Sequence, residues 1–189
     1  QTWYYGNSLS AVIGQAENNF TPLQIARYIA MLTNGGEEVD VTIVKDIIKE
    51  DGTSEDKESV KKYADEKLNL SKVNNEKLDI KKENIDVVLE GMKSVTTETG
   101  GTAYGVFRNF DIEVGGKTGS AEAGGKVNAW FVGFAPYDNP EIAVVVLIEN
   151  GSHGYYSAYV AKDIIEQHFK LKQVIEEDRT ALPYTEQQN

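Results

Sequence analysis

The sequence has 189 residues, and its 40% hydrophobic and 26% charged content is ordinary for one globular domain with a sizeable core. The formal net charge of −11 disfavours nucleic acid and anionic membrane surfaces as partners, because phosphate binding requires clustered cations. The absence of cysteine excludes disulfides and thiol chemistry, and the two histidines, His153 and His168, lie too far apart in sequence to support a metal site. No apolar run reaches the length of a membrane-spanning helix. Because the sequence begins at Gln1 inside an aromatic stretch, we expect a processed or truncated piece of a longer protein.

The first predicted element is a helix that begins at Thr21-Pro22. Threonine caps free backbone N–H groups, and proline is tolerated at the first helical position because its missing N–H would have no partner there. Gly35-Gly36 ends the helix. The residues that follow at helical spacing are Leu23, Ala26, Ile29, Ala30 and Thr33.

The segment after this helix predicts a small hairpin and then a charged excursion from the core. Residues 39–43 alternate between apolar and polar as a strand does, and Asp51-Gly52 is a turn signal. Over residues 50–82 the composition changes to Lys, Glu, Asp, Asn and Ser, with few large apolar residues. We expect this stretch to be solvated and partly helical at most.

A second amphipathic helix, predicted over residues 83–97, is followed by three strands in quick succession. The predicted strands are 112–122, 127–135 and 142–149. Their connections are too short for a crossover, so neighbouring strands are expected to be antiparallel. The last strand is continuously apolar, and we expect both of its faces to be covered.

A last helix is indicated after the loop 151–154, and we expect it to cover one face of the sheet. Its apolar positions are Ala158, Ala161, Ile164, Ile165 and Phe169. Residues 171–189 are polar and carry Pro183, so they are expected to form a weakly ordered tail. The order of elements predicts an α+β fold with a three-strand antiparallel sheet flanked by helices.

The most specific short string is Gly115-Gly116-Lys117-Thr118-Gly119-Ser120-Ala121-Glu122. A phosphate-binding loop also places Lys and Thr together, but it needs a longer glycine-rich loop between a strand and a helix. Here the Lys-Thr-Gly lies inside a predicted strand that leads into another strand, so that interpretation fails. An ordinary strand of small residues is the alternative, because a tripeptide of this kind recurs by chance.

Other short motifs surround this string in a fixed order. Before it come Ile13-Gly14-Gln15, Thr21-Pro22-Leu23-Gln24-Ile25-Ala26, Gly91-Met92 and Gly101-Thr102-Ala103. After it come Trp130-Phe131-Val132-Gly133-Phe134-Ala135-Pro136, Asp138-Asn139-Pro140-Glu141-Ile142-Ala143-Val144 and Glu149-Asn150-Gly151. The series resembles the C-terminal half of the transpeptidase domain of class B penicillin-binding proteins, and it looks closest to the elongation type called penicillin-binding protein 2. The resemblance implies that residues 1–170 are a portion of this domain and that 171–189 are the tail.

The resemblance implies the penicillin-binding, serine β-lactamase-like transpeptidase fold and an activity that needs no metal or organic cofactor. In that family an upstream Ser attacks the penultimate D-Ala carbonyl of a peptidoglycan stem peptide, and β-lactams trap the same Ser. Lys117 would attract the terminal carboxylate and assist proton transfer, while Thr118 and Ser120 would offer it hydroxyls. Gly119 would let the peptide lie close to the strand, and the backbone N–H of Ser120 would form half of the oxyanion hole.

Two of the three family motifs, Ser-x-x-Lys and Ser-x-Asn, are expected before Gln1. The first is spelled at Ser54 to Lys57 and at Ser59 to Lys62, but both lie in the charged stretch, which offers no rigid apolar surround for a nucleophile. Ser-x-Asn occurs nowhere in the sequence. We therefore expect the chain to carry one wall of an active site and to be inactive alone.

Several residues around the motif have two interpretations. Gly101-Thr102 could border the site or only stop the preceding helix, and Tyr155 and Tyr156 could border it or pack at a helix end. Trp130 could line the cleft, although a large aromatic residue on a central strand is more often core. The sequence departs from the family pattern at Ser120, where Thr is commoner, and at Ala16, where Gly is usual. The first change keeps the hydroxyl, and the second affects only local backbone geometry.

Two other functions stay open, namely a penicillin-recognising sensor domain that acylates without turnover and a non-catalytic interaction module. The partners implied by the resemblance are the stem peptide and β-lactams in the intact parent, at the extracytoplasmic face of a bacterial membrane, where a helix outside this chain anchors it. The apolar strand 142–148 would pair with the N-terminal part of the same domain. Without that part, we expect its open edge to form a homodimer.

Overall fold

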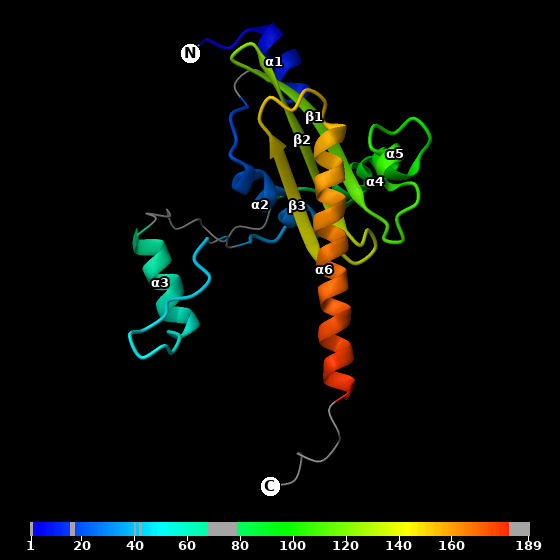
Figure 1. Cartoon of the computed structure of the whole chain (residues 1–189). Helices are drawn as coiled ribbons and strands as arrows, with labels where there is room; N and C mark the ends of the chain where they lie inside the picture. The colour runs from blue at the N-terminus through cyan, green and yellow to red at the C-terminus, as the bar shows by residue number, and fades with distance from the viewer. Residues whose placement is uncertain (1, 16–17, 40, 42, 68–78, 182–189) are drawn as a thin grey trace.

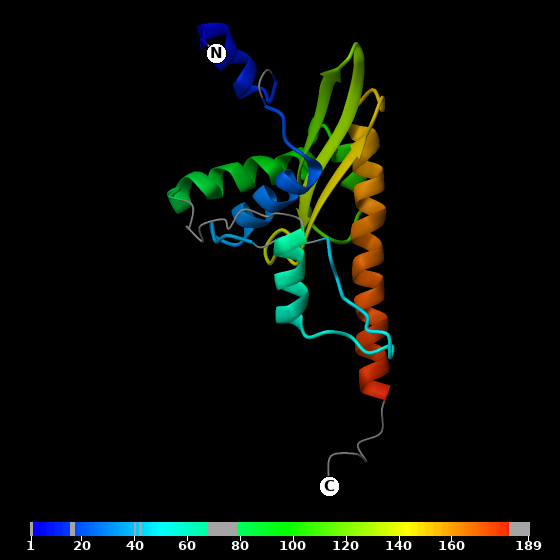
Figure 2. The ribbon, with the colours of Figure 1, turned by 90° about the vertical axis from the view of Figure 1, so that its left-hand side faces the viewer.

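A computed structural model describes residues 2–15, 18–39, 41, 43–67 and 79–181 of the chain. It has a three-stranded antiparallel sheet with helices on both faces (Figures 1 and 2), which confirms the predicted α+β fold. The strands are β1 (Gly115–Ala123), β2 (Lys126–Ala135) and β3 (Ile142–Ile148), and they lie in the order β1-β2-β3. The helices are α1 (Tyr5–Val12), α2 (Pro22–Thr33), α3 (Lys57–Lys67), α4 (Lys82–Thr97), α5 (Tyr104–Phe107) and α6 (Tyr155–Ala181).

All three strands form close to the predicted positions. The turn between β1 and β2 is the pair Gly124-Gly125, whose φ angles of 59° and 78° suit a tight hairpin that follows the strand twist. β1 begins later than predicted, because residues 112–114 run as a loop beside the end of α4. There the Thr96 hydroxyl donates to the Val114 carbonyl.

The sheet separates two apolar clusters. On one face α2 and α4 pack against β2 through Ile29, Leu32, Ile85, Met92 and Phe134. On the other face α5 and α6 cover the sheet, and Figure 2 shows α6 running along the strands on that side. β3 contacts both α2 and α6, so the prediction that the apolar strand has both faces covered is confirmed. The core of this second face includes Phe107, Val114, Phe131, Val146, Ala161 and Ile165.

Two phenyl rings lie directly on the backbone at the start of β1. Phe131 and Phe134 are fully buried, and strand alternation sends their side chains to opposite faces. A Cβ added to Gly116 would come closer than 3.0 Å to the Phe131 ring, and one added to Gly115 would collide with the Phe134 ring in the same way. The absence of side chains on the glycine pair therefore allows both rings to pack.

The three predicted helices form, and two short ones were not predicted. α2 begins with a capping box, in which Thr21 Oγ1 accepts from the Gln24 N–H and Thr21 N–H donates to Gln24 Oε1. α6 runs on to Ala181, through the first part of the predicted tail, because the added residues are mostly good helix formers such as Lys, Gln, Glu and Leu. Residues 182–189 lie outside the described part of the chain. The helices that sequence patterning missed are α1 and the four-residue α5.

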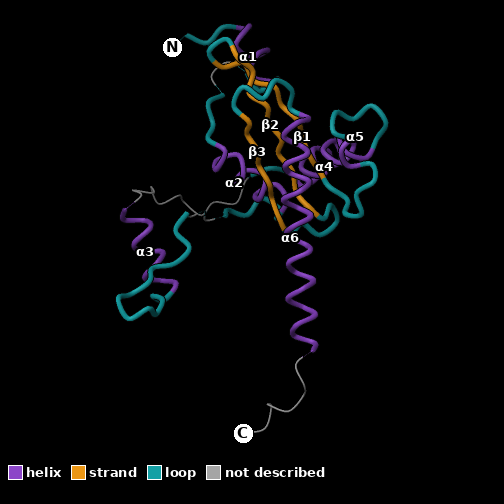
Figure 3. Tube along the Cα trace, in the orientation of Figure 1, coloured by secondary structure: helices purple, strands orange, loops and turns teal. Residues whose placement is uncertain are grey.

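The charged excursion carries α3 and lies to one side of the sheet (Figure 3). The predicted turn is present, since Lys49 N–H donates to the Thr53 carbonyl and Ile48 pairs with Ser54. The predicted strand at 39–43 is wrong for its described residues, which are not in a strand. The described residues of this segment pair with no strand in the described part of the chain, and alternation alone cannot supply a ladder of hydrogen bonds.

We predict that Phe134→Ala lowers the free energy of unfolding by about 3–5 kcal/mol, because it leaves a cavity between the sheet and α2 and α4. Urea denaturation measures this change. Phe20→Ala is the matched control, since the Phe20 side chain is 56% exposed and its loss should cost less than about 1 kcal/mol. Equal losses from both variants would contradict the proposed packing.

Candidate active site

The Lys-Thr-Gly motif lies in the middle of β1, at the edge of the sheet. β1 pairs with β2 in a register that sets Lys117 opposite Val132 and Gly119 opposite Trp130. Within the described residues no strand lies along the other side of β1. The motif therefore lies on an open strand edge that a substrate backbone can approach.

The Lys117 side chain is exposed and reaches along this edge. Its Nζ donates to the carbonyl oxygen of Thr118 at 2.6 Å, so that carbonyl points away from β2. In an antiparallel ladder the N–H and C=O groups of alternate residues point to the same side. The N–H of Ser120, two residues on, therefore also points to the open edge.

The Thr118 side chain is buried on the face covered by α5 and α6, where it meets the loop between α4 and α5. Thr118 Oγ1 lies 2.7 Å from Thr102 Oγ1, and either hydroxyl can donate. The preceding Gly101 packs under the end of α4, where an added Cβ would lie 2.6 Å from the Ser94 carbonyl oxygen. The two interpretations of Gly101-Thr102 thus fall on different residues, because Gly101 closes the helix and Thr102 contacts the motif.

Ser120 contacts a residue that the sequence did not single out. Its Oγ accepts a hydrogen bond of 3.1 Å from the N–H of Gly154, the residue before α6. Sequence patterning predicted only a loop at 151–154, because glycines between a strand and a helix are ordinary turn residues. A glycine that must lie against a neighbouring strand has the same appearance in sequence.

The other candidates lie apart from these contacts or contribute no polar atom to them. Trp130 is half-buried opposite Gly119, and Tyr155 and Tyr156 are exposed at the start of α6. The hydroxyls of the two Ser-x-x-Lys strings are held on the excursion, by Asp46 for Ser54 and by Asp56 for Ser59. Neither serine is brought to Lys117.

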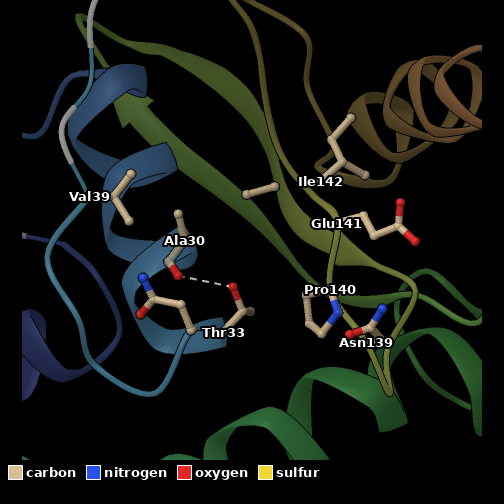
Figure 4. Close-up of a pocket in the computed structure, with 9 residues that line it drawn as sticks. Ala30, Thr33, Val39, Asn139, Pro140, Glu141 and Ile142 are labelled. Atoms are coloured by element: carbon tan, nitrogen blue, oxygen red, sulfur yellow. Dashed lines mark hydrogen bonds between the residues drawn. The ribbon is translucent and has the colours of Figure 1, made fainter.

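A separate cavity of about 310 Å³ lies at the opposite edge of the sheet, between the end of α2 and the start of β3 (Figure 4). The Thr33 hydroxyl, which lines the cavity, already donates to the Ala30 carbonyl. The Asn34 side chain is hydrogen-bonded to the backbone of Glu37. β2 and β3 lie between it and the open edge of β1. The cavity is therefore no part of the Lys117 site.

Neither a metal cluster nor a membrane-spanning helix is found in the part of the chain that the structure describes. No three His, Asp or Glu side chains there gather in a way that could hold a metal ion. None of the described helices is both long and apolar enough to cross a membrane.

Comparison with known proteins shows the family to which the chain belongs. Residues 1–170 match the family described as the penicillin binding protein transpeptidase domain. The peptidoglycan D,D-transpeptidase MrdA of Acinetobacter baumannii is 30% identical over 181 residues, which cover 87% of this chain and 24% of that protein. Penicillin-binding protein 2A of Bacillus subtilis is 27% identical, with 90% and 26% covered.

Solved structures agree with the sequence relatives. The crystal structure of Pseudomonas aeruginosa PBP2 in complex with WCK 5153 superposes with a TM-score of 0.70 at 32% identity, over 88% of this chain and 34% of that one. The complex of Helicobacter pylori PBP2 with MreC has the same fold, with a TM-score of 0.67 at 24% identity over 90% of this chain and 28% of that one.

The chain belongs to the penicillin-binding protein transpeptidase family. Within it, the chain is similar to class B transpeptidases of the MrdA (PBP2) type. It spans about a quarter of the length of the curated relatives that it matches.

We predict that Thr102→Val and Thr118→Val each lower the free energy of unfolding by about 1–2 kcal/mol, because each leaves the partner hydroxyl without its bond. The double variant should lose less than the sum, with a coupling of about 1 kcal/mol. Urea denaturation of the four proteins measures the cycle, and Thr102→Ser is the control that keeps a hydroxyl. Strict additivity would show that the two hydroxyls do not interact.

Proposed function

We propose that this chain forms the Lys-Thr-Gly wall of the active site in a serine D,D-transpeptidase that cross-links peptidoglycan stem peptides. The carrying observation is that residues 117–120 of one edge strand bring together an exposed cation, two hydroxyls on one face and a backbone N–H that points to the open edge. A peptide that ends in a carboxylate presents the matching acceptors.

Lys117 is proposed to select substrates by charge. It is the only charged side chain between Glu113 and Glu122, and it lies exposed on the edge. A unit charge pair about 4 Å apart near a protein surface interacts by roughly 4 kcal/mol. The substrate carboxylate would thus be drawn to Lys117 and would accept hydrogen bonds from the hydroxyls of Thr118 and Ser120.

The backbone N–H of Ser120 is proposed as one donor of the oxyanion hole. It points to the open edge, where a carbonyl bound along β1 would lie. Such a donor stabilises the negative oxygen of the tetrahedral intermediate more than the neutral carbonyl, typically by about 3–4 kcal/mol. Gly119, which has no side chain, leaves room for the peptide to lie close to the strand.

The nucleophile in this proposal is a serine outside the chain. Its Oγ attacks the penultimate D-Ala carbonyl carbon, and its proton passes, with help from Lys117, to the leaving amine of the terminal D-Ala. The ester that results is attacked by an amine of a neighbouring strand, and the serine recovers its proton. A β-lactam carbonyl enters the same reaction and stays as a stable ester. The parent would act at the extracytoplasmic face of the bacterial membrane.

We predict that benzylpenicillin acylates the complete domain, formed by this chain with the preceding part of its sequence. Peptide mapping after intact-mass analysis should place the label outside residues 1–189. Lys117→Ala should slow acylation on the order of a hundredfold or more, because it removes both the charge and the proton relay. Lys126→Ala is the matched control, since Lys126 is exposed at the hairpin end of β2, and Lys117 lies opposite Val132 six residues further along that strand. A label on this chain, or equal rates for Lys117→Ala and the parent, would contradict the proposal.

The open edge of β3 is proposed to bind the N-terminal part of the domain, or a second copy when that part is missing. β3 pairs only with β2 within the described residues, and its sequence is continuously apolar. The Thr118 carbonyl points away from β2, so the backbone groups of Lys117 and its partner Val132 point toward each other. The partner of Val132 on β3 is Val145, whose N–H therefore points away from β2 to the open edge.

We predict that the isolated chain forms dimers or larger species in light scattering, and that Val145→Pro reduces them, because proline removes an edge donor without breaking the ladder to β2. Val146→Pro is the contrasting control. The Val146 N–H points to β2, so its loss should unfold the sheet. A monodisperse monomer of 20.9 kDa for the parent chain would refute edge pairing.

A further inference from the structure

The loop between β3 and α6 is held tightly against the strands of the active site. Ser157 at the first turn of α6 is fully buried, and its hydroxyl donates to the Ala129 carbonyl at 2.8 Å. Ser152 N–H donates to the Val127 carbonyl at 3.1 Å. These two bonds fix the loop to β2 on either side of Gly154.

Gly154 itself lies over the backbone of the motif. An added Cβ would be 2.8 Å from Gly119 N, 2.9 Å from Trp130 O and closer still to Gly119 O. All three are backbone atoms of a paired ladder position, so none of them can move aside as a side chain would. Only glycine fits at 154 without displacing the start of α6 from the sheet.

The hydrogen bond from Gly154 has a fixed direction. A backbone N–H can only donate, so the Ser120 hydroxyl must accept at this contact, and its own proton stays available for another partner. At Thr118 the direction is undetermined, because both members of the pair with Thr102 are hydroxyls. Ser120 is therefore the hydroxyl of the motif whose role the fold defines.

We propose that Gly154 is a positioning residue that holds the Ser120 hydroxyl as a hydrogen-bond donor toward the substrate carboxylate. The inference rests on the proposed function and adds to it a residue from outside the motif. The contact uses only the hydroxyl oxygen, which Ser shares with the commoner Thr.

The test compares Gly154→Ala, Ser120→Ala and the double variant in the complete domain. Gly91→Ala is the matched control, because Gly91 lies exposed on α4 with open space around an added Cβ. The substrates are an acylated D-Ala-D-Ala peptide and the same peptide with a C-terminal amide. Ser120→Ala keeps the backbone N–H, so it separates the hydroxyl from the proposed oxyanion donor.

We expect Gly154→Ala and Ser120→Ala each to lower kcat/KM for the carboxylate peptide on the order of tenfold, with little change for the amide, since hydrogen bonds to charged groups are the stronger class. In the Ser120→Ala background Gly154→Ala should add almost nothing. A loss that persists in that background, or that is equal for both peptides, would overturn the proposal, because it would show a general disturbance of the fold.

A second measurement does not need the Gly154→Ala variant, so it tests the proposal even if that variant fails to fold. Hydrogen exchange of the Gly154 amide should become on the order of tenfold faster in Ser120→Ala, while the Gly91 amide is unchanged. If the exchange rate of the Gly154 amide is unchanged while benzylpenicillin still acylates the domain, this inference is overturned and the proposed function stands. A parent domain that benzylpenicillin does not acylate would overturn the proposed function, and this inference with it.

Discussion

The packing of two phenyl rings on a glycine backbone fixes the strand on which the site depends. Phe131 and Phe134 project to opposite faces of β2, and each ring lies against one residue of the pair Gly115-Gly116 at the start of β1. Close packing of this kind transmits displacement, because the interior has no free space to absorb it. Lys117 follows directly after Gly115-Gly116, so this contact sets the position of the cation and of the open edge.

The polar groups of β1 are held by segments that are distant in the sequence. Thr102 reaches Thr118 from the end of α4, and Gly154 reaches Ser120 from the start of α6. Both hydroxyls thus have one partner within the protein before any ligand arrives. Preorganisation of this kind lowers the cost of ordering side chains when a substrate binds.

Sequence patterning succeeded where one local signal determines the structure. Thr21-Pro22 began a helix because capping is decided within a few residues, and Gly124-Gly125 formed a hairpin turn because both positions need positive φ. It failed where pairing partners decide the outcome. Residues 39–43 alternate like a strand, but those of them that the structure describes pair with no described strand. α5 is only four residues long, too short for any periodic pattern.

The sequence by itself determined the family and the motif, because the identity and order of short motifs can be read without knowing where the residues lie in space. It also determined that Lys117, Thr118 and Ser120 share one strand. The tertiary structure alone decided which way their groups point and what holds them. The Ser120 N–H faces the open edge because the Thr118 carbonyl does, and its hydroxyl is held as an acceptor because Gly154 packs on Gly119. The contacts of Gly154 with Gly119 and Ser120 join residues more than thirty positions apart, and only the packing of α6 on the sheet brings them together.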